Sequence, residues 1–260
     1  SFVFDALSPD GRSMYLIEHL AGADPTHYQV RRFDVATGSL QDGTIVDKRN
    51  IGEQMNGYAV TQEAGQNGWI YTIYRGADGA FIHALDAADG VAFCIDLPGT
   101  DGATTTAAAP WGLVADPSGD ALYVVDPLRK TVSAIDLTDF SIRRTASLAS
   151  APTIRFAKLE NAEPVAGRAA LSRDGRTLYV ADTTGIDVVR VADLVTTGHL
   201  GGNTTFQSLA IGSAGRVYAV DDAGRAVQLG DGSASATSGT PAASAADGRY
   251  SAIVAIVPLH

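Results

Sequence analysis

The feature that most constrains the fold of this chain is a short motif that recurs five times around a tyrosine. In each copy a glycine and an apolar residue precede the tyrosine, and a short β-branched run that ends in a polar residue follows it. Self-similarity at a period of about 20–50 residues indicates a repeat architecture in which each copy is one supersecondary unit. The five tyrosines are Tyr15, Tyr71, Tyr123, Tyr179 and Tyr218, at spacings of 56, 52, 56 and 39 residues.

Turn residues flank each tyrosine and divide every copy into short strands. Upstream, turn formers come together, as in Pro9-Asp10-Gly11. Proline presets φ, aspartate bonds to its own backbone and glycine tolerates positive φ. Downstream, a third strand ends in a second turn that begins with an aspartate such as Asp34 or Asp86, and a fourth strand closes most copies. The sequence shows no long apolar stripe of helical period with caps, so almost no α-helix is expected.

Four antiparallel strands in each repeat predict an all-β fold, a β-propeller of four-stranded blades arranged radially. One such sheet cannot bury both of its faces alone, whereas radial stacking buries each face against a neighbour. Residues 116–126 followed by residues 131–136 resemble the YVTN-type propeller repeat of bacteria, and residues 178–183 resemble the related NHL repeat. These motifs specify the geometry of a blade and no particular activity.

The repeats predict a single propeller domain over residues 1–260 with five visible blades. Six or seven blades are expected if further residues precede Ser1, since the chain begins abruptly on an innermost strand. The final strand, residues 250–257, is apolar on both faces, which predicts self-association through the terminal blades or an incomplete domain; alternatively, blade packing covers one face and residues 230–248 cover the other. The Ser, Ala, Thr and Gly content of residues 230–248 predicts a flexible loop. The expected blades are residues 1–50, 51–105, 106–150, 165–202 and 203–260.

Composition excludes several classes of function. The net charge of −10 argues against nucleic acid as a partner, because phosphate binding needs a clustered basic surface. The longest apolar run is far shorter than the roughly 18 residues that a membrane helix needs. A single cysteine, Cys94, excludes an intrachain disulfide and a multi-cysteine zinc site. Cys94 stands in an apolar strand and is expected to be buried and inert, and Trp111 is expected in the core.

Long connections are predicted on one face of the propeller, and loops on a rigid scaffold commonly carry binding residues. The residue that ends each second strand would lie on this long-loop face, where repetition arranges these residues in a ring. A ring of carboxylates suits a hard cation such as Ca²⁺ in the channel, whereas an aspartate at a strand end commonly caps a turn instead. We expect turn capping and no cofactor. The five equivalent residues are Glu18, Tyr74, Asp126, Asp182 and Asp221.

The remaining chemistry of the sequence is sparse. His19 and His27 share one predicted loop with Asp24, which leaves open a two-histidine metal site. No GxSxG, HExxH, GxGxxG or phosphate-binding loop motif is present in the sequence.

Two functions from different classes therefore remain. The first is a non-enzymatic binding or scaffold propeller that recognises a protein, peptide or glycan through the long-loop face. The resemblance to exported bacterial YVTN-like propellers implies an extracytoplasmic location for it. The second is a lactonase-like, metal-assisted hydrolase with its site over the central channel, as in some similar propellers. For this second function Asp126, Arg129, Arg155, Glu160 and Asp182 are the available groups.

Overall fold

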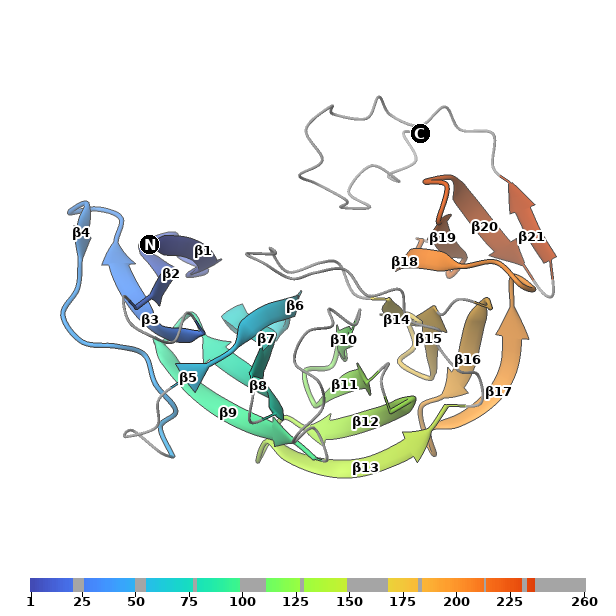
Figure 1. The fold of residues 1–260 in the computed structure, drawn as a ribbon, viewed down its shortest axis with the longest axis horizontal. Coiled ribbons are helices and arrows are strands. Elements are labelled where there is room, and N and C mark those ends of the chain that lie inside the picture. The colour runs from blue at the N-terminus through green and yellow to red at the C-terminus, as the bar shows by residue number, and fades with distance from the viewer. Residues whose placement is uncertain are drawn as a thin grey trace. The chain divides into compact units, whose positions relative to one another are not determined.

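The computed structural model describes residues 1–20, 26–49, 55–76, 79–98, 111–126, 129–148, 168–181, 184–212, 214–230 and 233–236. These residues form twenty-one β-strands and one short 3₁₀ turn, η1 (Gln66–Gly68) (Figure 1). No α-helix occurs in these ranges. Their one helical element, η1, is not long and apolar enough to cross a membrane. The predicted all-β fold class is confirmed.

The strands form five antiparallel sheets, and within each sheet the order of the strands in space follows their order along the chain. The first sheet contains β1 (Phe2–Leu7), β2 (Ser13–His19), β3 (His27–Asp34), β4 (Ser39–Leu40) and β5 (Met55–Asn56), which pairs with β3. The second sheet contains β6 (Tyr58–Ala64), β7 (Trp69–Gly76), β8 (Gly79–Asp86) and β9 (Val91–Leu97). The third sheet contains β10 (Gly112–Ala115), β11 (Ala121–Asp126), β12 (Thr131–Asp136) and β13 (Ser141–Ser147). The fourth sheet contains β14 (Ala169–Leu171), β15 (Thr177–Ala181), β16 (Ile186–Arg190) and β17 (Val195–Leu200). The fifth sheet contains β18 (Phe206–Ile211), β19 (Val217–Asp221), β20 (Ala226–Gly230) and β21 (Ser233–Ala236).

The repeated tyrosine lies in the second strand of every sheet, as predicted. Tyr123 pairs with Val114 on one side, and Tyr179 pairs with Ala170 on the equivalent side. The turn that precedes the tyrosine also repeats. The Asp10 carboxylate accepts hydrogen bonds from the Ser8 hydroxyl at 2.6 Å and the Arg12 amide at 3.0 Å. Ser172, Asp174 and Arg176 make the same contacts in the fourth sheet, so this turn chemistry is a property of the repeat.

The fifth sheet differs from its prediction. Its outermost strand is β21, which comes from the start of the tract predicted as a loop, and only two residues separate β21 from β20. The tract predicted as a loop therefore begins with a strand. Residues 237–248 and the predicted strand 250–257 lie outside the described residues. The first sheet also extends past its predicted end at residue 50, because β5 pairs with β3.

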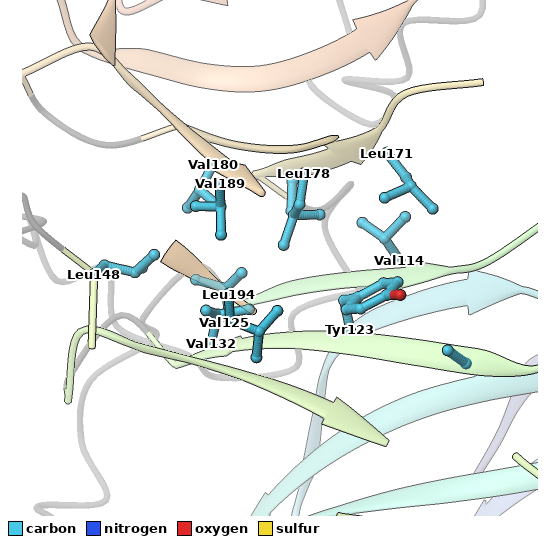
Figure 2. Packing of buried hydrophobic residues seen from close by; sticks show 12 residues of the cluster. Val114, Tyr123, Val125, Val132, Leu148, Leu171, Leu178, Val180, Val189 and Leu194 are labelled. Carbon is cyan, nitrogen blue, oxygen red and sulfur yellow. The ribbon is translucent and has the colours of Figure 1, made fainter. Parts of the chain in front are cut away.

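The chain divides into two compact units. The first unit contains residues 1–108 together with residues 139–141 and 157–164, and the second contains the rest of the chain. In the second unit, apolar side chains of the third and fourth sheets pack face to face, as Figure 2 shows for Tyr123, Val125, Leu178 and Val189. The opposite face of the fourth sheet packs on the fifth sheet through residues such as Ile186 and Phe206. Each face of the fourth sheet is thus buried against a neighbour, as the stacked-blade prediction requires.

In the first unit, the core lies between the first and second sheets. Tyr15, Ile17 and Val30 of the first sheet pack against Tyr74 and Leu85 of the second. Burial of apolar area stabilises by about 25 cal/mol per Å², so this interface holds the two sheets together.

In the second and fourth sheets, the turn between the third and fourth strands packs against the preceding sheet near its repeated tyrosine, a contact that we call the joint. The Tyr15 hydroxyl donates to the Ala87 carbonyl at 3.1 Å, and a Cβ on the neighbouring Gly90 would lie 3.0 Å from that hydroxyl. Gly90 has a φ of 70°, a conformation that glycine adopts without strain. In two later turns the equivalent positive-φ residue is Phe140 or Leu194. Leu194 is fully buried in the cluster that contains Tyr123 (Figure 2).

Candidate functional site

Two of the carboxylates predicted to face a ligand, Asp126 and Asp221, are engaged in turns. Asp126 ends β11, and its two oxygens accept from the Arg129 backbone amide at 3.1 Å and from the Arg129 guanidinium at 3.0 Å. Asp221 ends β19 and is 1% exposed. Its oxygens accept from the backbone amides of Ala223 and Arg225 and from the Arg225 guanidinium. These contacts match the turn-capping interpretation of the repeat-equivalent aspartates.

Glu18 and Tyr74, the equivalent residues of the first two sheets, have different surroundings. Glu18 accepts from Gln29 at 2.5 Å and from the Arg31 guanidinium at 2.9 Å across the hairpin of β2 and β3. Its pKa is lowered, and the hydrogen bond from Gln29 is the main cause. Tyr74 is buried between the first and second sheets.

The register of β2 and β3 keeps the two loop histidines apart. His19 lies opposite Tyr28 in this hairpin, so His19 shares the face of Tyr28, and His27 belongs to the other face. Among the described residues, no three His, Cys, Asp or Glu side chains gather in a way that suits a metal ion. Asp24, Arg155, Glu160 and Asp182 lie outside the described residues, so their predicted roles stay predictions.

Exposed apolar side chains gather instead on β1, the innermost strand of the first sheet. Phe2, Phe4 and Leu7 are 50%, 60% and 51% exposed. Phe2 pairs with Glu18, Phe4 with Leu16 and Leu7 with Met14, so the three lie on one face of the sheet, away from the Tyr15 face. We call Phe2, Phe4 and Leu7 the β1 apolar edge. Its Phe2 end lies beside the connection between β2 and β3, at the predicted long-loop end.

His199, which carried no predicted role, is held in the fourth sheet. Its Nδ1 lies 3.0 Å from Asp187 Oδ1, and its Nε2 lies 2.9 Å from the Thr184 carbonyl oxygen. A carbonyl oxygen only accepts, so Nε2 donates to it. Both ring nitrogens are thus engaged, and the pair ties the β15–β16 connection to β17.

A row of polar side chains crosses the face of the second sheet that packs on the first sheet. Gln62 pairs with Thr72, Thr72 with His83, and His83 with Cys94, so each of the four strands contributes one member. We call these four residues the polar row. Gln62 Nε2 donates to Thr72 Oγ1 at 3.0 Å and to Oδ1 of Asp5, on the first sheet, at 2.9 Å.

Both ends of the polar row meet a buried aspartate. Asp5, at the inner end, is the extra residue of a β-bulge in β1. At the outer end, Asp47 Oδ2 accepts from the Cys94 amide at 3.2 Å. Cys94 itself is half-buried, so the expectation of a buried thiol is wrong. Trp111 is buried, as expected.

Burial shifts the pKa of the titratable groups around the polar row. It raises the pKa of Asp5 to about 6, and the hydrogen bond from Gln62 opposes that rise. Burial lowers the pKa of His83 to about 4, while the nearby Asp47 carboxylate acts in the opposite direction. It also raises the pKa values of Tyr28 and Tyr74 well above their ordinary range. The neutral form of each group is therefore favoured, because a charged form would lose its hydration.

Comparison with known proteins identifies the architecture. No family model matches the sequence, and no curated protein matches it. Solved structures do match. Virginiamycin B lyase from Staphylococcus aureus is 13% identical with a TM-score of 0.54, over 86% of this chain and 64% of that one. The dihydro-heme d1 dehydrogenase NirN is 11% identical with a TM-score of 0.60, over 91% and 47%. The periplasmic gluconolactonase PpgL of Pseudomonas aeruginosa is 18% identical with a TM-score of 0.53, over 88% and 70%.

The fold is a β-propeller. The five antiparallel sheets correspond to its predicted blades. At these identities the likeness shows the fold alone, since unrelated functions share propeller scaffolds. The chain spans less than two thirds of the length of two of these three structures, NirN and the lyase.

Proposed function

We propose that this propeller is a non-enzymatic binding module that recognises a protein, peptide or glycan through its long-loop face. The observation that carries the proposal is the β1 apolar edge, where Phe2 and Phe4 are at least half exposed beside the β2–β3 connection. Contiguous exposed apolar side chains on a soluble domain commonly mark an interaction site. Aromatic side chains give large contact areas at a low cost in side-chain entropy, and interfaces are enriched in them.

Polar groups lie on the same face as the apolar edge. The Glu18–Arg31 ion pair spans β2 and β3 at 2.9 Å, and both side chains are partly exposed. Glu18 pairs with Phe2, so an aromatic ring and an ion pair lie side by side at one end of the sheet. Such a surface offers an apolar contact together with hydrogen-bond donors and acceptors, which suits a peptide segment or a sugar ring.

The test is selection of ligands with the folded chain. A displayed random peptide library and a glycan array would be probed with the wild type and with the double variant Phe2→Ser/Phe4→Ser. Val195→Ser is the matched control, because Val195 is 47% exposed on the outer strand β17. The proposal predicts ligands that bind the wild type and the control and lose at least about tenfold in affinity for the double variant, a loss of about 1.4 kcal/mol. Absence of any selected ligand, or ligands that bind all three proteins equally, would reject it.

The hydrolytic alternative makes a different prediction. Asp126 and Arg129 are paired with each other, so neither presents its full charge to a substrate. A lactonase-type site would then depend on Arg155, Glu160 and Asp182. Incubation of the chain with gluconolactone, with and without Ca²⁺, Mg²⁺ or Zn²⁺, should give no hydrolysis above the uncatalysed rate. Turnover that is lost in Asp126→Asn and Asp182→Asn would favour the hydrolase instead.

We also propose that the blades are of the YVTN/NHL type and that the protein functions outside the bacterial cytoplasm. The repeated turn of Ser8 and Asp10, which recurs as Ser172 and Asp174, supports a common blade type. Cell fractionation of the source organism with an antibody to this chain would test the location. Recovery in the cytoplasmic fraction alone would reject it.

A further inference from the structure

Four polar side chains are buried between the first two blades, and their ligand atoms have no hydrogen-bond partner among the described residues outside this group. Asp5, Tyr28, Tyr74 and His83 are 3%, 2%, 1% and 1% exposed. One carboxylate oxygen of Asp5 and both ring nitrogens of His83 have no hydrogen-bond partner in the described part of the chain, and the two phenol oxygens interact only with each other there. Each such group costs about 1–3 kcal/mol when buried unsatisfied, so their concentration in one interface calls for an explanation.

The four side chains come from both blades and meet in the same interface. The rings of Tyr28 and Tyr74 stack with centroids 4.4 Å apart, and the rings of Tyr74 and His83 meet edge to face at 6.2 Å. Asp5 is joined to the second blade by Gln62, whose Nε2 also reaches Thr72 in the strand next to His83. The four residues therefore surround one buried region between β1 and β3 on one side and β7 and β8 on the other.

We propose that Asp5, Tyr28, Tyr74 and His83 form a binding site for a ferric ion. A carboxylate and two phenolates are hard oxygen donors that supply three negative charges, which balance Fe³⁺, and the neutral imidazole completes the set. Hard donors select hard cations, so this combination suits Fe³⁺ better than a soft metal.

Other common ions fit this donor set poorly. Calcium takes six to eight oxygen ligands, mainly carboxylates and carbonyls, and Asp5 is the only carboxylate among the four residues. Structural zinc sites use thiolates and imidazoles in a tetrahedral arrangement. A phenol has an ordinary pKa of about 10, so only a strongly polarising cation displaces its proton at neutral pH. Binding of Fe³⁺ therefore releases the two phenolic protons, and affinity should rise with pH.

Gln62 acts as a positioning residue for the site. Its Nε2 donates to Oδ1 of Asp5, which leaves Oδ2 as the carboxylate atom without a partner. Outer hydrogen bonds of this kind orient ligands, and their removal commonly lowers metal affinity by about 10–100-fold. The bulge in β1 places Asp5 in this position, because it turns the aspartate out of the alternation of the strand.

The experiment loads the whole 260-residue chain with iron and reads the colour of the complex. The protein is refolded from urea with ferric nitrilotriacetate, so that the buried position is accessible, and then passed through a chelating column. The proposal predicts one retained iron per chain and a visible absorption band from charge transfer between phenolate and Fe³⁺. Tyr28→Phe and Tyr74→Phe should each weaken the band and lower iron retention by about tenfold or more. The double variant should show no band.

Controls separate the site from a general effect on the fold. Tyr123→Phe removes the hydroxyl of a buried tyrosine in the third blade and should leave the band unchanged. Gln62→Leu should lower iron affinity while the band position stays the same. Circular dichroism of every variant checks that it is folded, and Phe preserves the shape of Tyr. A folded wild type that retains no coloured iron, or a band that survives in the double variant, would overturn the proposal. A crystal structure grown with iron that shows only water among the four residues would also overturn it.

Discussion

At the scale of single residues, the buried groups between the first two blades give opposite contributions to stability as pH changes. The pKa of Asp5 is raised to about 6 in the folded chain, so its contribution to stability is present at low pH and is lost as pH rises through about 6. The pKa of His83 is lowered to about 4, so its contribution is present above its unfolded value and is lost as pH falls toward 4. Between about pH 4 and pH 6 the two slopes oppose each other in the metal-free protein.

Asp5→Asn should therefore stabilise the metal-free protein at pH 8, because the neutral amide avoids burial of a charge. A shift of two pKa units corresponds to about 3 kcal/mol, and we expect a gain of roughly 2 kcal/mol. Urea unfolding of the chelator-treated protein at pH 8 and pH 4.5 would measure it, with the gain shrinking at the lower pH. Asp10→Asn is the control, since Asp10 is exposed and its pKa is lowered by the hydrogen bond from Ser8. An equal gain in both variants would contradict the assignment to burial.

His83→Leu should change how the free energy of unfolding depends on pH below about 6.5. Leucine fills a similar volume without a titrating group, so the variant should gain stability over the wild type as pH falls from about 6.5 to about 4. The expected difference at pH 5 is about 2 kcal/mol, from roughly 1.5 pKa units. Urea unfolding across this range provides the measurement. Parallel curves for wild type and variant would show that His83 is not held neutral by burial.

At the scale of structural elements, the turn between the third and fourth strands of the second, third and fourth sheets contacts the preceding sheet. Leu194 has a φ of 60°, a conformation that costs a residue with a side chain about 1–2 kcal/mol. Its burial against the third blade offsets this cost. Phe140, with a φ of 58°, stacks on Phe93 at 4.8 Å and contacts Trp69 at 5.4 Å.

Leu194→Ala should destabilise the protein by about 3 kcal/mol, because it removes buried methyl groups and keeps the backbone strain. Val195→Ala, on the exposed next residue, should change stability by less than about 0.5 kcal/mol. Denaturant unfolding with a constant m-value would measure both variants. A loss of less than 1 kcal/mol at position 194 would indicate that its side chain contributes little to the joint between the blades.

The sequence was sufficient to predict the elements that depend on local chemistry. Turns built on Asp10, Asp34, Asp86 and Asp174 follow from side-chain hydrogen bonds within a few residues, and the tyrosine spacing follows from the repeat. The polar row was missed because its members do not stand out in the sequence: Gln62 lies between Thr61 and Glu63, and Thr72 shares its strand with Arg75. Their alignment arises only from the strand register.

At the scale of the whole molecule, charge and exposed apolar surface act against each other. The net charge of −10 repels like copies, whereas the β1 apolar edge favours contact between them. Salt screens exposed charges over about 8–10 Å at physiological ionic strength, and over less at higher salt. The balance between these two forces therefore depends on ionic strength.

Self-association should consequently increase with salt and depend on the β1 apolar edge. We expect a larger average mass by analytical ultracentrifugation at 1 M salt than at low salt, and a smaller increase for Phe2→Ser/Phe4→Ser. Val195→Ser should behave as the wild type. A chain that is monomeric at all salt concentrations, or a double variant that associates equally, would contradict the predicted role of this edge.

The joint between a tyrosine and the turn of the next blade has a consequence for engineering by exchange of repeats. A blade that is cut from the first to the last strand of one sheet carries a turn between its third and fourth strands. The side chain of that turn fits the preceding blade of the original protein, which the transplanted blade leaves behind. Gly90 is small where the Tyr15 hydroxyl approaches, and Leu194 fills space beside Tyr123. A transplanted module should therefore be cut so that each turn travels with the tyrosine that it meets. The segment to transplant therefore does not coincide with one sheet, because it combines the tyrosine-bearing strand of one sheet with the turn between the third and fourth strands of the next.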